Sequence, residues 1–319
     1  MKNTTSTALP QGYTPNKKSK WKTFKKFIPI YFLALPGLAY LFINNYMPFP
    51  GLVLAFKNFN AKLGIFDSPW AGFDNFKYLF QNDVGYITRN TILYNLAFIV
   101  INTTLAIMVA IILSEMTSRF KKFYQSSILL PYLISTVIVA YLVYAFLGTD
   151  QGFINKTLLP MVGADSISWY TETKYWPVIL IIVSAWKTVG YSCIIYLATI
   201  MGFDKSYYEA ARIDGATKMQ QIFRITIPML RGTIIMLVLL SIGRIFYSDF
   251  GLFYQVPRNS GALYSVTNTI DTYVYRGLLE LGNIPMTSAA GFYQSLVGFV
   301  LILGANLVVR KIDSENALF

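Results

Sequence analysis

Long apolar stretches separated by polar segments dominate the pattern of this chain. A helix needs about 20 apolar residues to cross the hydrocarbon core of a bilayer. Because backbone N–H and C=O groups cannot stay unpaired in lipid, stretches of that length are expected to be helices. The pattern predicts six transmembrane helices, near residues 27–47, 91–114, 126–147, 176–200, 228–248 and 286–309.

A polar segment between the fourth and fifth of these stretches carries its own helix signals. Ser206 with Glu209, and Thr217 with Gln220, have the spacing of a capping box, in which side chains bond the free amides at a helix start. Gly215 suits the left-handed residue that ends a helix. The segment is therefore predicted to form two short helices joined by a turn.

The composition agrees with an all-α polytopic membrane protein. Of 319 residues, 55% are hydrophobic and 13% are charged, whereas about a quarter of the residues in a soluble domain are charged. The chain has no histidine and one cysteine, Cys193, which is most simply a small buried hydrophobe. This excludes a His/Cys metal cluster, a histidine-based catalytic triad and an internal disulfide, and no metal site is expected.

The net charge of +12 is explained by membrane topology, without a nucleic-acid partner. With the N-terminus in the cytoplasm, and with Arg231 at the start of the fifth span counted on the cytoplasmic side, 17 Lys and Arg residues fall on that side, 8 in the three outer loops and 2 within the spans. Cytoplasmic loops carry the excess of cations, so both termini are predicted to be cytoplasmic. The predicted organisation is a basic tail at 1–26, a six-span domain at 27–310 with a cytoplasmic loop at 204–227, and a tail at 311–319.

Polar side chains within the spans are the candidates for a binding site, because a charged group in lipid is costly unless it faces a partner or a wet cavity. In the fourth span, one helical face carries Ser184, Lys187, Thr188 and Tyr191. This stripe is equally consistent with a hydrogen-bonded seam between helices.

The spacing within the 204–227 loop resembles a known signature. It reads Glu209-Ala210-Ala211, three residues, Gly215, nine residues and Ile225-Thr226-Ile227-Pro228. This resembles the E-A-A loop of ABC importer permeases, with Ile227 where the family usually has leucine. Stretches across about residues 29–310 resemble the type I permeases of the LplB-like oligo- and polysaccharide subgroup. They include Tyr46-Met47-Pro48, Trp70-Ala71-Gly72, Arg89-Asn90-Thr91, Trp186-Lys187-Thr188-Val189-Gly190 and Asp271-Thr272-Tyr273-Val274-Tyr275-Arg276.

The resemblance implies a type I ABC importer permease (MetI-like) fold, with a five-helix core wrapped by the first span and a cytoplasmic coupling helix. It implies a heterodimer with a second homologous permease subunit, two cytoplasmic ATPase subunits and an extracellular sugar-binding protein. The sequence has no P-loop, so ATP and Mg²⁺ are expected on the ATPases. This chain is then expected to bind no cofactor and to be no enzyme. Its expected location is the cytoplasmic membrane of a bacterium.

The resemblance also divides the candidate residues into two groups. Coupling to the ATPase is assigned to Tyr207, Tyr208, Glu209, Ala210, Ala211, Arg212 and Gly215. The path of the sugar is assigned to Ser184, Lys187, Thr188, Tyr191, Phe246, Tyr247 and Asp249. Their donors, acceptors and aromatic rings suit sugar hydroxyls and the apolar face of a pyranose. The alternative for Lys187 and Asp249 is a structural salt bridge that closes the path, formed with each other or with Arg244.

Two other classes of protein fit the sequence less well than an importer permease. A cation-coupled secondary sugar transporter needs carboxylates buried within its spans, and none of the 15 acidic residues lies there, since Asp249 is at a span end. A membrane-embedded enzyme such as a glycosyltransferase needs paired carboxylates at the membrane face. One loop does hold Asp204, Glu209 and Asp214, but helix capping already accounts for the last two. The predicted function is therefore an ABC importer permease that carries an oligosaccharide or polysaccharide by alternating access.

Overall fold

The computed structural model describes residues 20–82, 84–116 and 118–312. These residues are almost entirely helical and divide into two compact units, Met1–Leu52 and Val53–Phe319. Most of the predicted basic tail at 1–26 and of the C-terminal tail at 311–319 lies outside the described residues.

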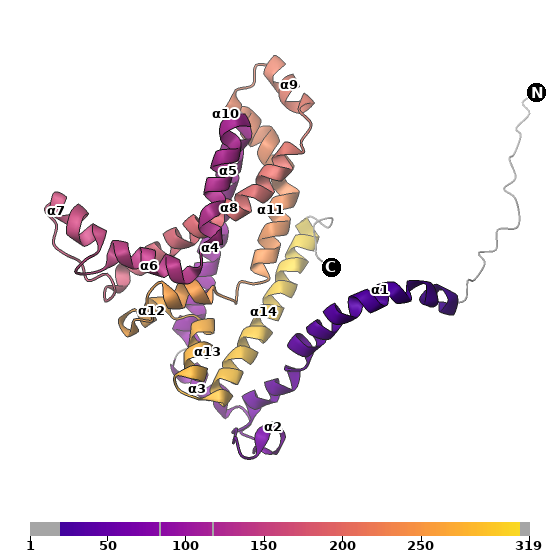
Figure 1. Cartoon of the computed structure of the whole chain (residues 1–319), viewed down its shortest axis with the longest axis vertical. Coiled ribbons are helices and arrows are strands. Elements are labelled where there is room, and N and C mark those ends of the chain that lie inside the picture. The colour runs from indigo at the N-terminus through magenta and orange to yellow at the C-terminus, as the bar shows by residue number, and fades with distance from the viewer. Residues whose placement is uncertain (1–19, 83, 117, 313–319) are drawn as a thin grey trace, which may run out of the picture. The chain divides into compact units, whose positions relative to one another are not determined.

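The first unit is one long helical segment. Helix α1 (Lys20–Leu41) contains Pro29 and Pro36 and continues into the π-helical turn η1 (Phe42–Tyr46). Figure 1 shows α1 as a curved helix without a break, so the prolines bend it and do not end it. A candidate span at Phe27–Phe56 covers most of α1, all of η1 and the 3₁₀ turn that follows, which ends at Phe56.

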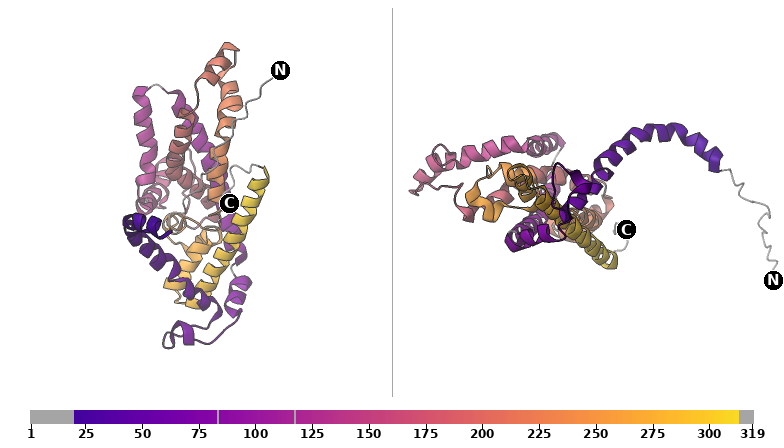
Figure 2. Two further views of the ribbon diagram at one scale, coloured as in Figure 1. Left: turned by 90° about the vertical axis from the view of Figure 1, so that its right-hand side faces the viewer. Right: turned by 90° about the horizontal axis from the view of Figure 1, so that it is seen from below.

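The second unit contains the other helices. Its α-helices are α2 (Gly64–Asp67), α3 (Asp74–Asn82), α4 (Val84–Glu115), α5 (Ser118–Leu133), α6 (Thr136–Leu147), α7 (Leu159–Met161), α8 (Trp176–Met201), α9 (Ser206–Ile213), α10 (Lys218–Gln221), α11 (Ile227–Ile242), α12 (Tyr264–Thr267), α13 (Ile270–Leu279) and α14 (Ile284–Ile312). Short 3₁₀ turns are η2 (Phe49–Phe56), η4 (Thr173–Tyr175) and η7 (Gly261–Leu263), and π-helical turns are η3 (Ile154–Leu158), η5 (Ile222–Thr226) and η6 (Gly251–Gln255). Figure 1 and the left view of Figure 2 place α9 at one end of this unit and α3 with α13 at the opposite end.

Five helices of the described chain are long and apolar enough to cross a membrane, and a bent pair brings the number to as many as six. That pair is the predicted third span, 126–147, which is not one straight helix: the α5 and α6 segments meet at 95°. The Ser135 side chain accepts from the Ile138 amide and caps α6 at the break. Lys187 of α8 donates to the Ile134 carbonyl at 2.8 Å and to the Thr136 hydroxyl at 2.9 Å. The ammonium group of a neighbouring helix thus bonds a backbone carbonyl at the bend, where regular helical hydrogen bonds are interrupted. The sequence around the bend does not show this contact.

Helix α8 packs against both α4 and α5, and small residues allow the close approach. On α4, Ala106 and Ala110 are fully buried, and on α8, Cys193 is fully buried in the same cluster. The prediction that Cys193 is a small buried hydrophobe is confirmed.

Gly190 marks the point where α8 meets the backbone of α5. A Cβ at this position would lie 1.9 Å from the Ile128 carbonyl oxygen, an atom that no side-chain movement can displace. We expect Gly190→Ala to lower the free energy of unfolding by about 1–3 kcal/mol or more, seen as a lower melting temperature in detergent. The matched control is Gly291→Ala in α14, where an added Cβ meets nothing within 4 Å. Equal melting temperatures for the two variants would contradict this packing.

Candidate functional site

The fifth predicted span ends early, and an irregular segment takes its place. Helix α11 ends at Ile242, and residues 243–249 run as turns and extended chain before η6 begins. In a membrane protein, non-helical backbone at this depth is tolerated only where protein or a wet cavity surrounds it. The hydrogen bonds of residues 243–249 therefore show what holds the segment.

Side-chain amides from two other helices bond the carbonyl groups of this segment. Asn95 of α4 donates to the Ile245 carbonyl at 2.9 Å and to the Tyr247 carbonyl at 3.1 Å. Gln294 of α14 donates to the Phe246 carbonyl at 2.7 Å. These three bonds replace helical partners that the carbonyls lack.

A carboxylate from α13 bonds the same segment from another side. Asp271 Oδ2 accepts from the Ser248 amide at 2.6 Å and from the Ser248 hydroxyl at 2.7 Å. Its Oδ1 accepts from Gln294 Nε2 at 3.1 Å. Helices α4, α13 and α14 thus fix one irregular segment, and the side chains it presents are held in place.

The segment forms one wall of a cavity of about 670 Å³ between α4, α8 and α11. Five of the predicted sugar-path residues line it, namely Ser184, Thr188, Tyr191, Tyr247 and Asp249. Other polar groups in the wall come from Asn95, Asn102, Thr103, Ser192, Ser241, Arg244 and Ser248. Asn102 donates to the Ser184 hydroxyl at 3.2 Å, and its buried Oδ1 has no hydrogen-bond partner among the described residues. The cavity therefore offers hydroxyl, amide, guanidinium and carboxylate groups to a polar ligand.

Two of the predicted sugar-path residues do not line this cavity. Phe246 is 1% exposed and packs in an apolar cluster with Tyr273 and Met286. Lys187 turns toward the α5–α6 break, where its ammonium bonds backbone and hydroxyl oxygens. The salt-bridge alternative also fails, because no ion pair joins Lys187, Asp249 or Arg244 in the described chain. Asp249 instead accepts from the Leu252 amide at 3.1 Å and caps η6.

Sequence reasoning missed the residues that hold the irregular segment. Asn95, Asp271 and Gln294 were not predicted to take part in the site. A signal was present in the second predicted span, where Asn95 and Asn102 are seven residues apart and so share a helical face. No comparable signal marks Asp271, because its partner Ser248 lies outside any regular element.

The predicted cytoplasmic loop begins with α9, whose start differs from the prediction. The Ser206 side chain makes no capping hydrogen bond, so the predicted Ser206–Glu209 capping box is wrong. Asp204 caps the start of α9 instead, because its Oδ1 accepts a hydrogen bond from the Ser206 amide at 2.9 Å. Hydrogen bonds from the Ser206 backbone and side chain lower the pKa of the Asp204 carboxyl.

The turn after α9 has the predicted geometry. Gly215 has φ +78°, the left-handed conformation that favours glycine, and the next amide, of Ala216, donates to the Ala211 carbonyl at 2.8 Å. The second capping box is confirmed, since Thr217 and Gln220 bond each other's backbone amides reciprocally. The helix that follows is not a separate short one, however. Elements α10, η5 and α11 run on as one segment, Lys218–Ile242.

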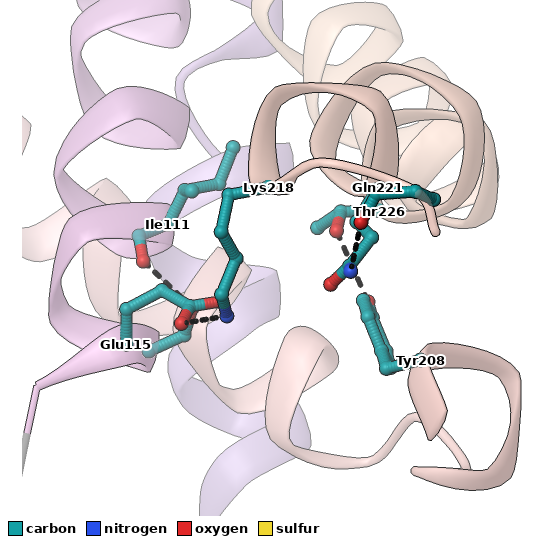
Figure 3. A network of polar contacts seen from close by, with 8 residues as sticks. Ile111, Glu115, Tyr208, Lys218, Gln221 and Thr226 are labelled. Carbon is teal, nitrogen blue, oxygen red and sulfur yellow. Dashed lines mark hydrogen bonds and ion pairs between the residues drawn. The ribbon is translucent and has the colours of Figure 1, made fainter. Parts of the chain in front are cut away.

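Two contacts within this loop and one contact to α4 hold it in place, and Figure 3 shows this region. The Tyr208 hydroxyl lies 3.1 Å from the Thr226 hydroxyl, and Gln221 donates to the Ala216 carbonyl at 3.0 Å. At the end of α4, Glu115 forms an ion pair with Lys218 at 2.5 Å. Helix α9 is thus linked to the start of the 25-residue helical segment that leads to the cavity.

The predicted coupling residues differ in exposure. Tyr207, Glu209, Ala210, Arg212 and Gly215 are exposed, whereas Tyr208 and Ala211 are half-buried. Large apolar side chains on the same loop are also exposed, with Ile213 at 87% and Met219 at 64%. Sequence reasoning did not select these two.

Comparisons with known proteins match most of the chain. The family described as "Binding-protein-dependent transport system inner membrane component" matches residues 102–314. The protein LplB of Bacillus subtilis (strain 168) is 33% identical over 302 residues, which cover 94% of this chain and 92% of LplB. The polygalacturonan/rhamnogalacturonan transport system permease protein YteP of the same organism is 32% identical over 289 residues, or 90% of this chain and 89% of YteP.

Solved structures extend the match to three dimensions. A chain in the crystal structure of a bacterial ABC transporter involved in the import of the acidic polysaccharide alginate has a TM-score of 0.84 and 32% identity, covering 92% of this chain and 99% of that chain. A chain in the alginate transporter complexed with an alginate pentasaccharide-bound periplasmic protein has a TM-score of 0.82 and 32% identity, covering 92% and 97%. The predicted all-α importer-permease fold is confirmed. The chain belongs to the family of inner-membrane components of binding-protein-dependent transport systems.

Proposed function

We propose that this permease carries an oligosaccharide or polysaccharide across a bacterial cytoplasmic membrane by alternating access, driven by ATP that separate subunits hydrolyse. The observation that carries this proposal is the irregular segment 243–249, held by three helices at the wall of a polar cavity. Broken helices of this kind build substrate sites in membrane transporters. Relatives whose printed names specify polygalacturonan and alginate transport support the substrate class.

The chemistry of the cavity suits a saccharide. Sugar hydroxyls both donate and accept, and the wall provides both kinds of partner in Ser184, Thr188, Asn102 and Asp249. Tyr191 stacks on Tyr132 with ring centroids 4.5 Å apart, so its ring is held in a fixed orientation at the cavity edge.

Coupling follows from the continuity of one helical segment. Residues 204–227 present Tyr207, Glu209 and Ile213 on the surface, where we place the contact with an ATPase. The segment Lys218–Ile242 then leads directly to residues 243–249. Movement imposed on α9 would pass along this segment and change the cavity wall that carries Arg244 and Asp249.

The proposal includes an assembly and an orientation. Its partners are a second homologous permease, two cytoplasmic ATPase subunits that bind ATP and Mg²⁺, and an extracellular sugar-binding protein, with this chain binding no cofactor. Cytoplasmic termini are supported by the distribution of Lys and Arg. These residues are in excess in the loop 204–227 and in the other segments assigned to the same side.

Energy coupling is tested with the complete transporter in proteoliposomes. We expect saccharide uptake to require ATP on the side of the ATPases and to continue when an ionophore removes ion gradients. Uptake that persists without ATP and stops with the ionophore would contradict the proposal, and would indicate a cation-coupled carrier.

A further inference from the structure

A second polar pocket lies at the other end of η6 from the cavity. It has a volume of about 300 Å³ and is lined by Val137, Ala140, Tyr141, Tyr254, Gln255, Arg258 and Asn259. Asp249 caps the start of η6 and lines the cavity, while Tyr254 and Gln255 end η6 and line the pocket. One short helical turn thus has a polar site at each end.

The backbone of this pocket is strained at two successive residues. Arg258 and Asn259 have φ of +56° and +49°, and they are the non-glycine residues with positive φ in the described chain. Such conformations cost of order 1–3 kcal/mol each and persist only where the surroundings impose them. The contacts of Arg258 and Asn259 should therefore explain their strained conformations.

Asn259 is held by three side chains. Arg276, which is buried, donates to Asn259 Oδ1 at 2.8 Å, and the Tyr264 hydroxyl donates to the same atom at 3.0 Å. Asn259 Nδ2 donates to Glu280 at 3.1 Å. This network explains why Asn259 keeps its conformation. It does not involve the Arg258 side chain, which the strained backbone directs elsewhere.

The Arg258 side chain lies against tyrosine rings and keeps its hydrogen-bond donors free. Its guanidinium carbon is 4.2 Å from the centroid of the Tyr144 ring and 5.9 Å from that of Tyr141. The guanidinium donates no hydrogen bond and forms no ion pair with any residue that the structure describes. Glu280, the nearby acid, already accepts from Asn259 and Tyr254.

A guanidinium that packs over an aromatic ring and keeps its N–H groups unpaired is suited to a planar carboxylate, which two of those N–H groups can bind in a bidentate way. Tyr141 and Tyr254 supply aromatic surface beside it, and Gln255 supplies an amide. Tyr254 is held by stacking on Phe250, with ring centroids 5.0 Å apart. The pocket is therefore built for an acidic, carbohydrate-like group.

We propose that Tyr141, Tyr254 and Arg258 form a subsite for a carboxylate-bearing sugar residue of an oligosaccharide whose chain extends along η6 to the cavity at Asp249. The inference rests on the proposed function and specifies its substrate class as an acidic oligosaccharide. A monosaccharide occupies one site only, whereas a longer chain occupies both. Arg258 should therefore matter for long acidic chains and not for short or neutral ones.

The test uses the complete transporter in proteoliposomes, with oligogalacturonides of two and five units and the same oligomers after reduction of their carboxyl groups. Uptake is measured at subsaturating concentration as the ratio of variant to wild type, which cancels selection by the binding protein. Arg258→Gln is expected to lower uptake of the acidic pentamer about tenfold. Uptake of the acidic dimer and of the reduced pentamer should stay within about twofold of wild type.

Two further variants separate recognition from folding. Arg258→Gly removes the guanidinium and relieves the positive-φ strain, so it should fold at least as well as wild type and show the same selective loss. Arg119→Gln, on the exposed start of α5, should change nothing. An equal loss for all four saccharides, or no loss for the acidic pentamer, would overturn the subsite.

The wild-type transporter distinguishes this inference from the function on which it rests. Import of neutral saccharides in preference to acidic ones leaves the proposed function standing and overturns the carboxylate subsite. Failure to import any saccharide, acidic or neutral, overturns both.

Discussion

Asp271→Ala is expected to reduce saccharide uptake about 100-fold, the largest loss that a single side chain outside the cavity should cause. The carboxylate accepts from the Ser248 amide, the Ser248 hydroxyl and Gln294. Removing it leaves these donors without their partner, and each hydrogen bond to a charged group contributes about 1.5–3 kcal/mol. Residues 243–249 would then lose their position at the cavity wall. The measurement is initial uptake by the complete transporter in proteoliposomes.

Controls distinguish a displaced cavity wall from a general loss of folding. Asp271→Asn keeps one acceptor oxygen but turns an amide donor toward a second donor. Its saccharide uptake should therefore lie between that of wild type and that of Asp271→Ala. Asp67→Ala removes an exposed carboxylate from α2 and should transport normally. Normal uptake by Asp271→Ala would show that the segment does not need this anchor.

Glu209→Lys is expected to remove most of the stimulation of ATP hydrolysis by saccharide while leaving the permease folded. Glu209 is exposed and lines a cleft of about 520 Å³ beside Tyr208 and Arg212. Its reversal changes the charge of the proposed docking surface by two units, and juxtaposed like charges oppose binding of a complementary partner. ATPase activity of the assembled transporter is measured with and without saccharide and binding protein.

The matched control for Glu209→Lys is Glu172→Lys, since Glu172 is an exposed glutamate in the loop before α8, away from α9. Both variants should melt at the wild-type temperature because both side chains are exposed. Only Glu209→Lys should lose stimulation. Equal stimulation in the two variants would mean that the loop 204–227 is a connector without a coupling role.

The features that sequence predicted well depend on neighbours along the chain. A run of apolar residues must be helical in lipid wherever it packs, so helices lie at the predicted stretches, although the third is bent and the fifth ends at Ile242. The Gly215 turn and the Thr217–Gln220 capping box are also local, because their partners lie within three or four residues. The stripe on α8 was found from helical periodicity, which places Ser184, Thr188 and Tyr191 on one face.

The errors occur where periodicity stops. Beyond Ile242 the chain is irregular, and no repeat indicates which side chains face the cavity. Phe246 and Tyr247 were therefore treated alike, although one is buried in the core and the other lines the cavity. Lys187 lies on the same helical face as the cavity residues, but its side chain bonds the break between α5 and α6. The uninterrupted apolar run 126–147 gives no sign of that break.

Hydrophobic length, charge and capping act over a few residues, so the class of protein, the helices and the loop signature can be predicted from the sequence. The position of the site depends on how the helices pack. Asn95, Asp271 and Gln294 hold one irregular segment from three separate helices. The strained conformation of Asn259, next to Arg258, likewise depends on Arg276 of α13. These arrangements are hydrogen bonds between distant parts of the chain, and they form only when the helices have packed.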